Sequence, residues 1–293
     1  MAFSDKVTSV PQTRRQFVAG AAATAAVAGS VATGLGAGGE STASALVAGS
    51  LLSVASDVPD ASVEAHGSLA ARRLVTSGAR SPDALALADP ALFAGVAESP
   101  TLFATNALTL AYDPESAHAD AIRDDWPTAL RADGVRVGRT DPAVDPLGYR
   151  TLLALRLAAR RGLLDDADPV VANTRVFPET QLARVLDSGN VDAAFVYRSM
   201  AVEYDMPTVD LPPAIDFSDP ARADTYASVS LDLGGRVVTG APIRYGAVTL
   251  TERGRSWVQE FTEDADRLRD HGFRVPDAYP VTERESTATP SGD

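Results

Sequence analysis

Two serines stand in short glycine-containing segments that could bind an anion. Ser50 lies in residues 48–51, at the end of an apolar stretch, and Ser68 lies in residues 66–69, ahead of an apolar helical pattern. A serine at the mouth of a turn with free backbone N–H groups offers the geometry that holds a tetrahedral anion. A Gly-Ser pair before a helix can equally be only an N-cap. Neither segment alone therefore identifies a binding site.

Two acidic residues begin predicted helices. Residues 138–150 contain two Asp-Pro steps, and the second, Asp145-Pro146, directly precedes a long apolar helical pattern. Because a residue before proline avoids the α region and proline favours the first helical position, we expect Asp145 to be the N-cap of this helix. Glu179 falls in the first turn of a second helical pattern, residues 176–186, where a carboxylate compensates the helix dipole. On this interpretation both acids only stabilise helix ends.

The elements that would position these residues follow from the apolar periodicity. We expect strands near residues 46–52, 82–89, 103–112, 135–138, 193–196 and 242–250, and helices from 68, from 124, over 148–161, over 176–186 and near 253–271.

Composition bounds the class of protein. The 293 residues are 45% hydrophobic, which is enough for a packed body of one or two lobes. The chain has no cysteine, so disulfides, thiolate metal sites and lipid anchoring through an N-terminal cysteine are excluded. The net charge is −13 and Lys6 is the only lysine, which fits a protein kept soluble in very high salt. No basic stripe is present to neutralise phosphates, so we expect no nucleic-acid partner.

The N-terminal residues carry an export pattern. Residues 13–18 (TRRQFV) contain a twin arginine, and a weakly apolar run extends to about Gly38. A transmembrane helix is the alternative, but the many glycines and alanines make a poor span. We predict a Tat signal and linker over residues 1–44, with residues 43–45 as a possible cleavage site and retention as a membrane anchor left open. The acidic, Ser/Thr-rich residues 282–293 predict a disordered tail.

Residues 138–150 (GRTDPAVDPLGYR) resemble the signature of archaeal tungstate/molybdate-binding proteins, the solute-binding subunits of ABC importers. The resemblance includes both Gly-Ser turns, residues 103–106 (FATN), the segment around Glu179, and residues 187–201. It implies an α/β, two-lobed periplasmic-binding-protein-like fold (type II), with each lobe a mixed sheet flanked by helices. Lobe one is then expected over residues 45–103 plus 206–281 and lobe two over 104–205, with hinges near Asn106 and Val202.

The resemblance also implies a binding chemistry. Tungsten(VI) and molybdenum(VI) are hard centres that can exceed four oxygen ligands, so an aspartate and a glutamate can complete an octahedron. Sulfur and phosphorus expand less readily, which implies selectivity against sulfate and phosphate. Tyr197, which follows a predicted buried strand, could donate its hydroxyl to the anion or only pack in the core. The implied ligand-binding residues are Ser50, Ser68, Asp145, Leu147, Glu179 and Tyr197, with Asp145 and Glu179 coordinating the metal centre.

Two departures from the family pattern keep an alternative open. The family normally places a long helix between the two Gly-Ser turns, whereas only residues 52–65 separate them here, so the first helix is expected to be shortened or missing. The connection between the two carboxylate segments is also shorter than in the family. A relative that binds another oxoanion, such as sulfate, therefore remains the first alternative.

The predicted function is capture of tungstate or molybdate outside the cell by a monomer that hands it to an ABC permease, without a cofactor. The second alternative is an enzyme on the same two-lobed scaffold. The three histidines, His66, His118 and His271, show no nucleophile–His–acid spacing, and we therefore predict no enzyme activity.

Overall fold

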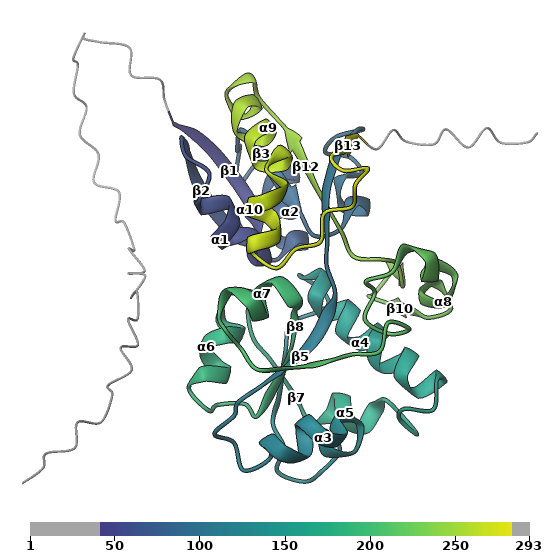
Figure 1. Ribbon diagram of the computed structural model, residues 1–293. Coiled ribbons are helices and arrows are strands. Elements are labelled where there is room, and N and C mark those ends of the chain that lie inside the picture. The colour runs from purple at the N-terminus through teal and green to yellow at the C-terminus, as the bar shows by residue number, and fades with distance from the viewer. Residues whose placement is uncertain (1–41, 283–293) are drawn as a thin grey trace, which may run out of the picture. The chain divides into compact units, whose positions relative to one another are not determined.

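Two mixed β-sheets organise the chain in the computed structural model, which describes residues 42–282 (Figure 1). The six-stranded sheet contains, in spatial order, β13 (Val281–Thr282), β4 (Thr101–Thr105), β12 (Arg244–Thr249), β3 (Ala84–Leu87), β1 (Ala43–Ala48) and β2 (Ala61–His66). The five-stranded sheet contains β7 (Thr174–Val176), β6 (Val137–Arg139), β8 (Ala193–Tyr197), β5 (Leu108–Tyr112) and β9 (Thr208–Asp210). We call the six-stranded sheet with its helices lobe one, and the five-stranded sheet with its helices lobe two. A separate hairpin pairs β10 (Ser230–Asp232) with β11 (Val237–Thr239).

Helices connect and cover the strands. The α-helices are α1 (Leu52–Ser56), α2 (Ser68–Thr76), α3 (Ala119–Ala129), α4 (Pro146–Arg160), α5 (Asp168–Ala172), α6 (Leu182–Asp187), α7 (Arg198–Glu203), α8 (Ala223–Ala227), α9 (Arg255–Glu263) and α10 (Ala265–Asp270). Short 3-10 turns are η1 (Gly49–Leu51), η2 (Pro90–Phe93), η3 (Glu179–Gln181), η4 (Pro220–Arg222) and η5 (Glu252–Gly254).

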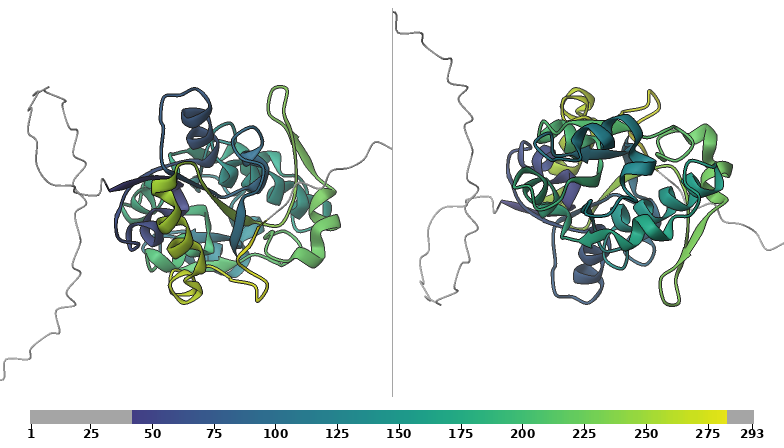
Figure 2. Two further views of the ribbon diagram at one scale, coloured as in Figure 1. Left: turned by 90° about the horizontal axis from the view of Figure 1, so that it is seen from above. Right: turned by 90° about the horizontal axis from the view of Figure 1, so that it is seen from below.

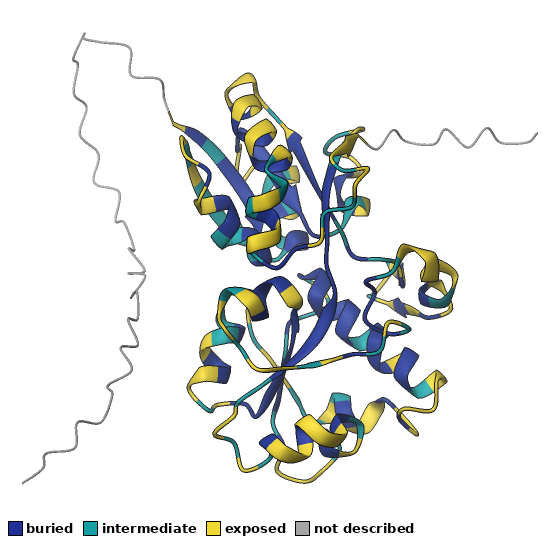
Figure 3. Ribbon diagram, in the orientation of Figure 1, coloured by how far each residue is buried: buried dark blue, intermediate teal, exposed yellow. Residues whose placement is uncertain are grey.

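Each sheet combines parallel and antiparallel pairs. In lobe one β1 pairs in parallel with β2 and β3, while β12 runs antiparallel to β3 and β4. In lobe two β6 pairs in parallel with β7 and β8, while β5 runs antiparallel to β8 and β9. The inner strands β3 and β8 are buried along their whole length because helices cover both faces, as the dark blue strands in Figure 3 show. The prediction of two mixed sheets flanked by helices is confirmed.

The predicted cap and start of the helix after Asp145 are confirmed, but the helix expected over residues 176–186 begins only at Leu182, since Val176 ends the strand β7 and a 3-10 turn precedes the helix. The helix α4 begins at Pro146 with Asp145 as its N-cap, and Glu179 begins the turn η3 that leads into α6. Between the two Gly-Ser turns the helix α1 is only five residues long, so the first helix is shortened as expected.

The predicted boundary between the lobes at residue 206 is wrong. The strand β9 pairs with β5 and therefore belongs to lobe two, so the chain returns to lobe one only at β12. For the same reason the second hinge does not lie at Val202, which is part of α7 between two strands of lobe two. The strand β9 is only three residues long, and only its middle residue is half-buried. Such a short segment does not indicate from sequence which sheet it joins.

Two helix predictions and one region need correction. The helix expected near residues 253–271 is two helices, α9 and α10, separated at Asp264, whose carboxylate caps α10. The helix expected from residue 124 already begins at Ala119, and its irregular residue Asp125 lies just before Pro127, which lacks the N–H that helix continuation needs. The hairpin β10–β11, which packs against α4, was not expected (Figure 2).

The structure does not test the predictions for the two ends of the chain. Almost all of the Tat signal and linker over residues 1–44, and the tail after residue 282, lie outside the described residues. Within residues 42–282 the structure has no helix long and apolar enough to cross a membrane.

The buried Asp192 should make the fold of lobe two sensitive to acid. It accepts hydrogen bonds from the Arg136 backbone N–H (2.7 Å), the Arg136 guanidinium (2.9 Å) and the Ser116 hydroxyl (2.8 Å). Burial alone would raise the pKa of Asp192, but the hydrogen bonds from Arg136 outweigh it and lower the pKa from 3.8 to about 2. Because the folded state holds this carboxylate ionised, its contribution is present above pH 3.8 and is lost as the pH falls toward 2.

We therefore expect Asp192→Asn to lower the free energy of unfolding by about 2 kcal/mol at pH 7. Urea titrations at a series of pH values should show this difference shrinking below about pH 4. The exposed Asp133 provides the control, since Asp133→Asn should change stability by less than about 0.5 kcal/mol at every pH. A difference of equal size at pH 7 and pH 3 would contradict the role of the Asp192 charge.

Candidate functional site

Asp145 uses only one of its carboxylate oxygens for capping. Its Oδ1 accepts a hydrogen bond of 2.9 Å from the backbone N–H of Leu147. Within residues 42–282 its Oδ2 makes no hydrogen bond of good geometry, although the residue is only 2% exposed and the Thr140 hydroxyl is near enough to lower its pKa. A helix cap needs one oxygen, and buried oxygens in proteins are normally paired. Oδ2 is therefore available to a ligand, because the helix cap uses only Oδ1.

Glu179 is buried, and within residues 42–282 neither carboxylate oxygen makes a hydrogen bond of good geometry, although Ser50 and the Gly49 amide lie close enough to affect its charge. The side chain reaches from η3 in lobe two to the first Gly-Ser turn in lobe one. A Cβ added at Gly49 would collide with Oε2 of Glu179 and would lie 2.9 Å from its Cδ. The Gly49-Ser50 turn is thus the surface against which the Glu179 carboxylate packs.

The Asp145 segment makes the corresponding contact with the second Gly-Ser turn. A Cβ added at Gly67 would lie 2.7 Å from the Val144 carbonyl oxygen and 3.1 Å from the Asp145 Cβ. The Ala70 N–H in the first turn of α2 also donates to the Val144 carbonyl at 3.2 Å. Both carboxylate segments of lobe two therefore meet the two Gly-Ser turns of lobe one.

The two carboxylates affect each other's ionisation. Burial raises the pKa of Asp145 to about 6, although the hydrogen bond from Leu147 works in the opposite direction. Burial and the nearby charge of Asp145 together raise the pKa of Glu179 well above its ordinary value, while Ser50 and the Gly49 amide lower it less. Like charges that are close and buried are costly unless a positive or electrophilic centre lies between them.

The three predicted hydroxyl groups are buried near these acids, and each has a defined partner. Ser50 Oγ lies 3.1 Å from Tyr245 Oη, and Ser68 Oγ accepts a hydrogen bond of 3.0 Å from the Ala88 N–H. Tyr197 Oη accepts a hydrogen bond of 2.7 Å from Arg150, and its pKa is raised by burial and, less strongly, by the charges of Asp145 and Glu179. The structure therefore brings together the segments of all the predicted residues. The Leu147 N–H, also predicted to bind the ligand, donates to Asp145 here.

Arg150 is a residue that the sequence analysis did not assign. It is the one arginine classed as buried among residues 42–282, and its guanidinium donates to the Ala88 carbonyl (2.7 Å) and to Tyr197 Oη. It supplies a permanent positive charge beside the acids. Its position in the first turns of α4, three residues after Leu147 on the buried face, was the signal that could have identified it.

Asn106 and Tyr245 were also missed as members of this region. Asn106 Nδ2 donates to Ser199 Oγ at 2.8 Å and to Tyr245 Oη at 3.2 Å. The sequence predicts a hinge near Asn106 and a strand near residues 242–250 that includes Tyr245, but no contact between the two.

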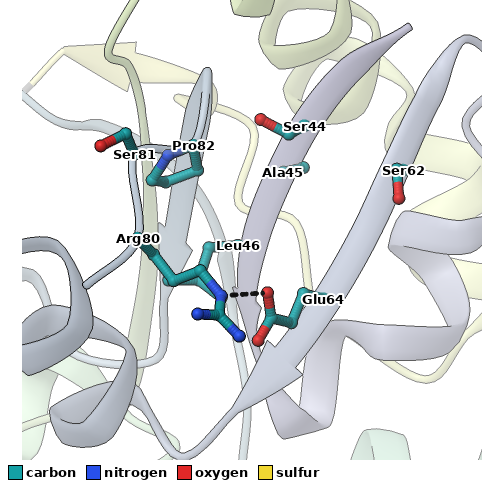
Figure 4. Close-up of a pocket in the computed structure, with 8 residues that line it drawn as sticks. All are labelled: Ser44, Ala45, Leu46, Ser62, Glu64, Arg80, Ser81 and Pro82. Carbon is teal, nitrogen blue, oxygen red and sulfur yellow. Dashed lines mark hydrogen bonds and ion pairs between the residues drawn. The ribbon is translucent and has the colours of Figure 1, made fainter. Parts of the chain in front are cut away.

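Two hollows on the surface lie away from Asp145 and Glu179. One of about 130 Å³ lies beside β1 and β2, where Arg80 Nε donates to Glu64 Oε2 at 2.9 Å (Figure 4). His66 Nε2 lies 2.8 Å from Oε1 of the same glutamate, so the His66 side chain is bound to Glu64 and not to Asp145 or Glu179. No cluster of three or more histidine and acidic residues that could hold a resident metal ion occurs in the described part of the chain. The lining residues of the hollow are Ser44, Ala45, Leu46, Ser62, Glu64, Arg80, Ser81 and Pro82.

Comparison with known proteins identifies the family. The sequence profile described as bacterial extracellular solute-binding protein matches residues 59–274, well over half of the chain. The chain belongs to this extracellular solute-binding protein family. Membership assigns this solute-binding protein to binding rather than catalysis.

Curated relatives of this solute-binding protein include archaeal proteins. One from Haloferax volcanii, provisionally named an ABC transporter molybdenum-binding protein, is 45% identical over 91% of this chain and 93% of its own length. An uncharacterized solute-binding protein of Halobacterium salinarum is 33% identical over 93% and 96% of the two chains. The molybdate/tungstate-binding protein WtpA of Thermococcus kodakarensis is 30% identical over 64% and 63%.

Solved structures confirm the type II fold of this solute-binding protein. The periplasmic molybdate-binding protein of Azotobacter vinelandii superposes with a TM-score of 0.58 at 14% identity, covering 80% of this chain and 99% of that one. The sulfate-binding protein SubI of Mycobacterium tuberculosis gives a TM-score of 0.52 at 13% identity, covering 80% and 87%. At such low identity these likenesses establish the fold alone.

Proposed function

We propose that this solute-binding protein captures molybdate or tungstate outside the cell and delivers it to an ABC permease. The observation that carries the proposal is the meeting of Asp145 and Glu179 at the two Gly-Ser turns. Asp145 Oδ2 and both Glu179 oxygens are buried there without a hydrogen bond of good geometry from any described residue. The names of the Haloferax and Thermococcus relatives support the same ligand class.

Two carboxylates suit this ligand because its central atom is electrophilic. A tetrahedral dianion held only by hydrogen bonds would be repelled by Asp145 and Glu179. Molybdenum(VI) and tungsten(VI) accept additional hard oxygen ligands, so one oxygen from each acid can complete six-fold coordination. The hydroxyls of Ser50, Ser68 and Tyr197 would donate to the oxo atoms. Sulfate gains nothing from the acids, because sulfur does not expand its coordination in this way.

The same pair would couple lobe closure to ligand capture. Asp145 and Glu179 come from lobe two, and the turns that cover them come from lobe one. Without a ligand, closing the lobes buries two mutually repelling carboxylates, which opposes closure. With the ligand present, coordination converts this repulsion into attraction, so the closed form is favoured by differential binding.

The wider setting is part of the same proposal. Export by the Tat pathway, with the signal cleaved or kept as an anchor, would place a monomer at the cell surface beside its permease. The acidic composition, with arginine in place of lysine, would keep that monomer soluble in high salt.

Isothermal titration of the purified protein with tungstate, molybdate, sulfate and phosphate tests the proposal. We expect binding of tungstate and molybdate, with at least about 100-fold weaker binding of sulfate and phosphate, a difference of about 2.7 kcal/mol. Preferential binding of sulfate would favour the alternative of a relative with a different oxoanion. Absence of tungstate and molybdate binding would reject the proposed ligand.

A further inference from the structure

Ser50 is connected to a chain of buried polar groups that starts at the crossing between the lobes. Asn106, directly after β4, contacts Tyr245 on β12, and Tyr245 contacts Ser50 in the turn after β1. Asn106, Tyr245 and Ser50 are each at most 3% exposed. Water therefore cannot easily supply alternative partners, and the direction of each hydrogen bond is set by the protein itself.

The direction is fixed at Asn106. Its Oδ1 faces the backbone N–H groups of Ala107 (2.9 Å) and Ser199 (3.4 Å). Backbone N–H groups only donate, so the atom facing them must be the amide oxygen and the opposite atom must be the nitrogen. The two hydrogens of Nδ2 then go to Ser199 Oγ and to Tyr245 Oη.

The direction at Asn106 favours one arrangement of the two hydroxyls that follow it. Tyr245 Oη receives a hydrogen bond from Asn106, so its own proton is free to go to Ser50 Oγ at 3.1 Å. In this arrangement Ser50 Oγ accepts from Tyr245, and its own proton points elsewhere. On the other side of the turn lies the Glu179 carboxylate, which packs against Gly49, the residue before Ser50.

We propose that Asn106 and Tyr245 form a relay of positioning residues that makes Ser50 an obligate donor toward the bound oxoanion. This inference rests on the proposed function, because it deepens the role of Ser50 at the same site. The ring of Tyr245 packs edge-on against the rings of Phe273 and Tyr197, with distances between ring centroids of 5.2 Å and 6.1 Å. The relay therefore presents a preoriented hydroxyl, which saves the entropy of orienting it when the ligand binds.

The hydroxyls of Ser68 and Tyr197 are also left with a proton to donate to the ligand. Ser68 accepts from a backbone N–H and Tyr197 accepts from a guanidinium, groups that only donate. Each hydroxyl therefore keeps its own proton for a ligand that offers only acceptors. The relay is what extends this rule to Ser50, whose partner is itself a hydroxyl and could otherwise act in either direction.

Tyr245→Phe tests the relay because it removes only the hydroxyl and keeps the ring. We expect the affinity for molybdate, measured by calorimetry, to fall about 10-fold. Tyr226→Phe is the matched control: this buried tyrosine donates to the Pro213 carbonyl, away from the relay, so its loss should leave the affinity unchanged.

A double-mutant cycle separates positioning from general packing. Ser50→Ala alone should weaken molybdate binding, and Tyr245→Phe added to Ser50→Ala should weaken it no further, because the relay acts only through Ser50. Equal effects of Tyr245→Phe in both backgrounds would overturn the relay, as would unchanged affinity in either single variant.

Neutron diffraction from deuterium-exchanged crystals of the protein gives a test that needs no ligand. The relay requires deuterium on Tyr245 Oη directed at Ser50 Oγ, and the opposite direction would overturn it. If the unmodified protein binds neither molybdate nor tungstate, the proposed function fails while the neutron map still decides the direction of the relay.

Discussion

Replacing Asp145 with asparagine should weaken tungstate binding by at least about 100-fold. Loss of a residue that only supports a metal ligand typically costs 10- to 100-fold, and a direct ligand should cost no less. Asparagine is as good an N-cap as aspartate, so the Leu147 N–H keeps its acceptor and α4 keeps its start. The variant thus removes the charge and the coordinating oxygen without removing the cap. Calorimetric titration with tungstate measures the loss.

Stability and affinity should change in opposite directions in this variant. The pKa of Asp145 is raised to about 6 by burial, so at pH 7 the fold carries a carboxylate that is less favourable than in the unfolded chain. Removing it is expected to raise the free energy of unfolding of the ligand-free protein by on the order of 1 kcal/mol. A general structural defect would instead lower both quantities.

Asp141→Asn is the matched control, because Asp141 precedes the other proline of the same segment. Its Oδ1 accepts from the Ala143 N–H at 2.9 Å, a turn that asparagine also forms, and it is half-buried rather than buried. We expect its tungstate affinity to stay within a few-fold of the unmodified protein. Unchanged affinity in Asp145→Asn would remove Asp145 from the coordination sphere.

The parts of the site that sequence reasoning found depend on short-range rules. The Asp145-Pro146 step fixes a cap and a helix start within two residues, and the Gly-Ser pairs mark turns on their own. Resemblance to a family then supplied what spacing could not, namely that these local features meet. The structure places Glu179 against Gly49, two residues 130 positions apart in the chain, as that resemblance requires.

The parts that were missed depend on long-range packing. Nothing near Tyr245 in the sequence shows that its hydroxyl meets Ser50, because the contact spans 195 residues. The lobe boundary failed at β9 for a similar reason, since a three-residue strand gains its identity only from the partner β5. Local patterns therefore predicted which residues could bind, while the tertiary fold decided how their hydrogen bonds are directed.

Gly49→Ala should lower tungstate affinity about 10- to 100-fold while leaving the fold intact. The added methyl group would collide with the Glu179 carboxylate, and because the glutamate end is the flexible partner, that carboxylate would move away from its position. The backbone itself should tolerate alanine, since Gly49 begins a 3-10 turn without a positive φ. Calorimetry with tungstate and urea unfolding would measure the two quantities side by side.

Gly78→Ala is the control: it should lower stability without changing the tungstate affinity. The comparison shows whether an affinity loss in Gly49→Ala comes from Glu179 or from general destabilisation. Gly78 has a φ of 73° with open space around its Cβ position, so alanine there strains the backbone and should cost about 1 kcal/mol of stability. Gly78 follows the C-terminal end of α2, whereas the Asp145 segment contacts the N-terminal end of that helix at Gly67 and Ala70, so the tungstate affinity of Gly78→Ala should not change. If both glycine variants lost affinity in proportion to their stability, the Glu179 carboxylate would not need the space beside Gly49. If only Gly49→Ala loses affinity, the close packing of that carboxylate on the first Gly-Ser turn is what the binding site requires.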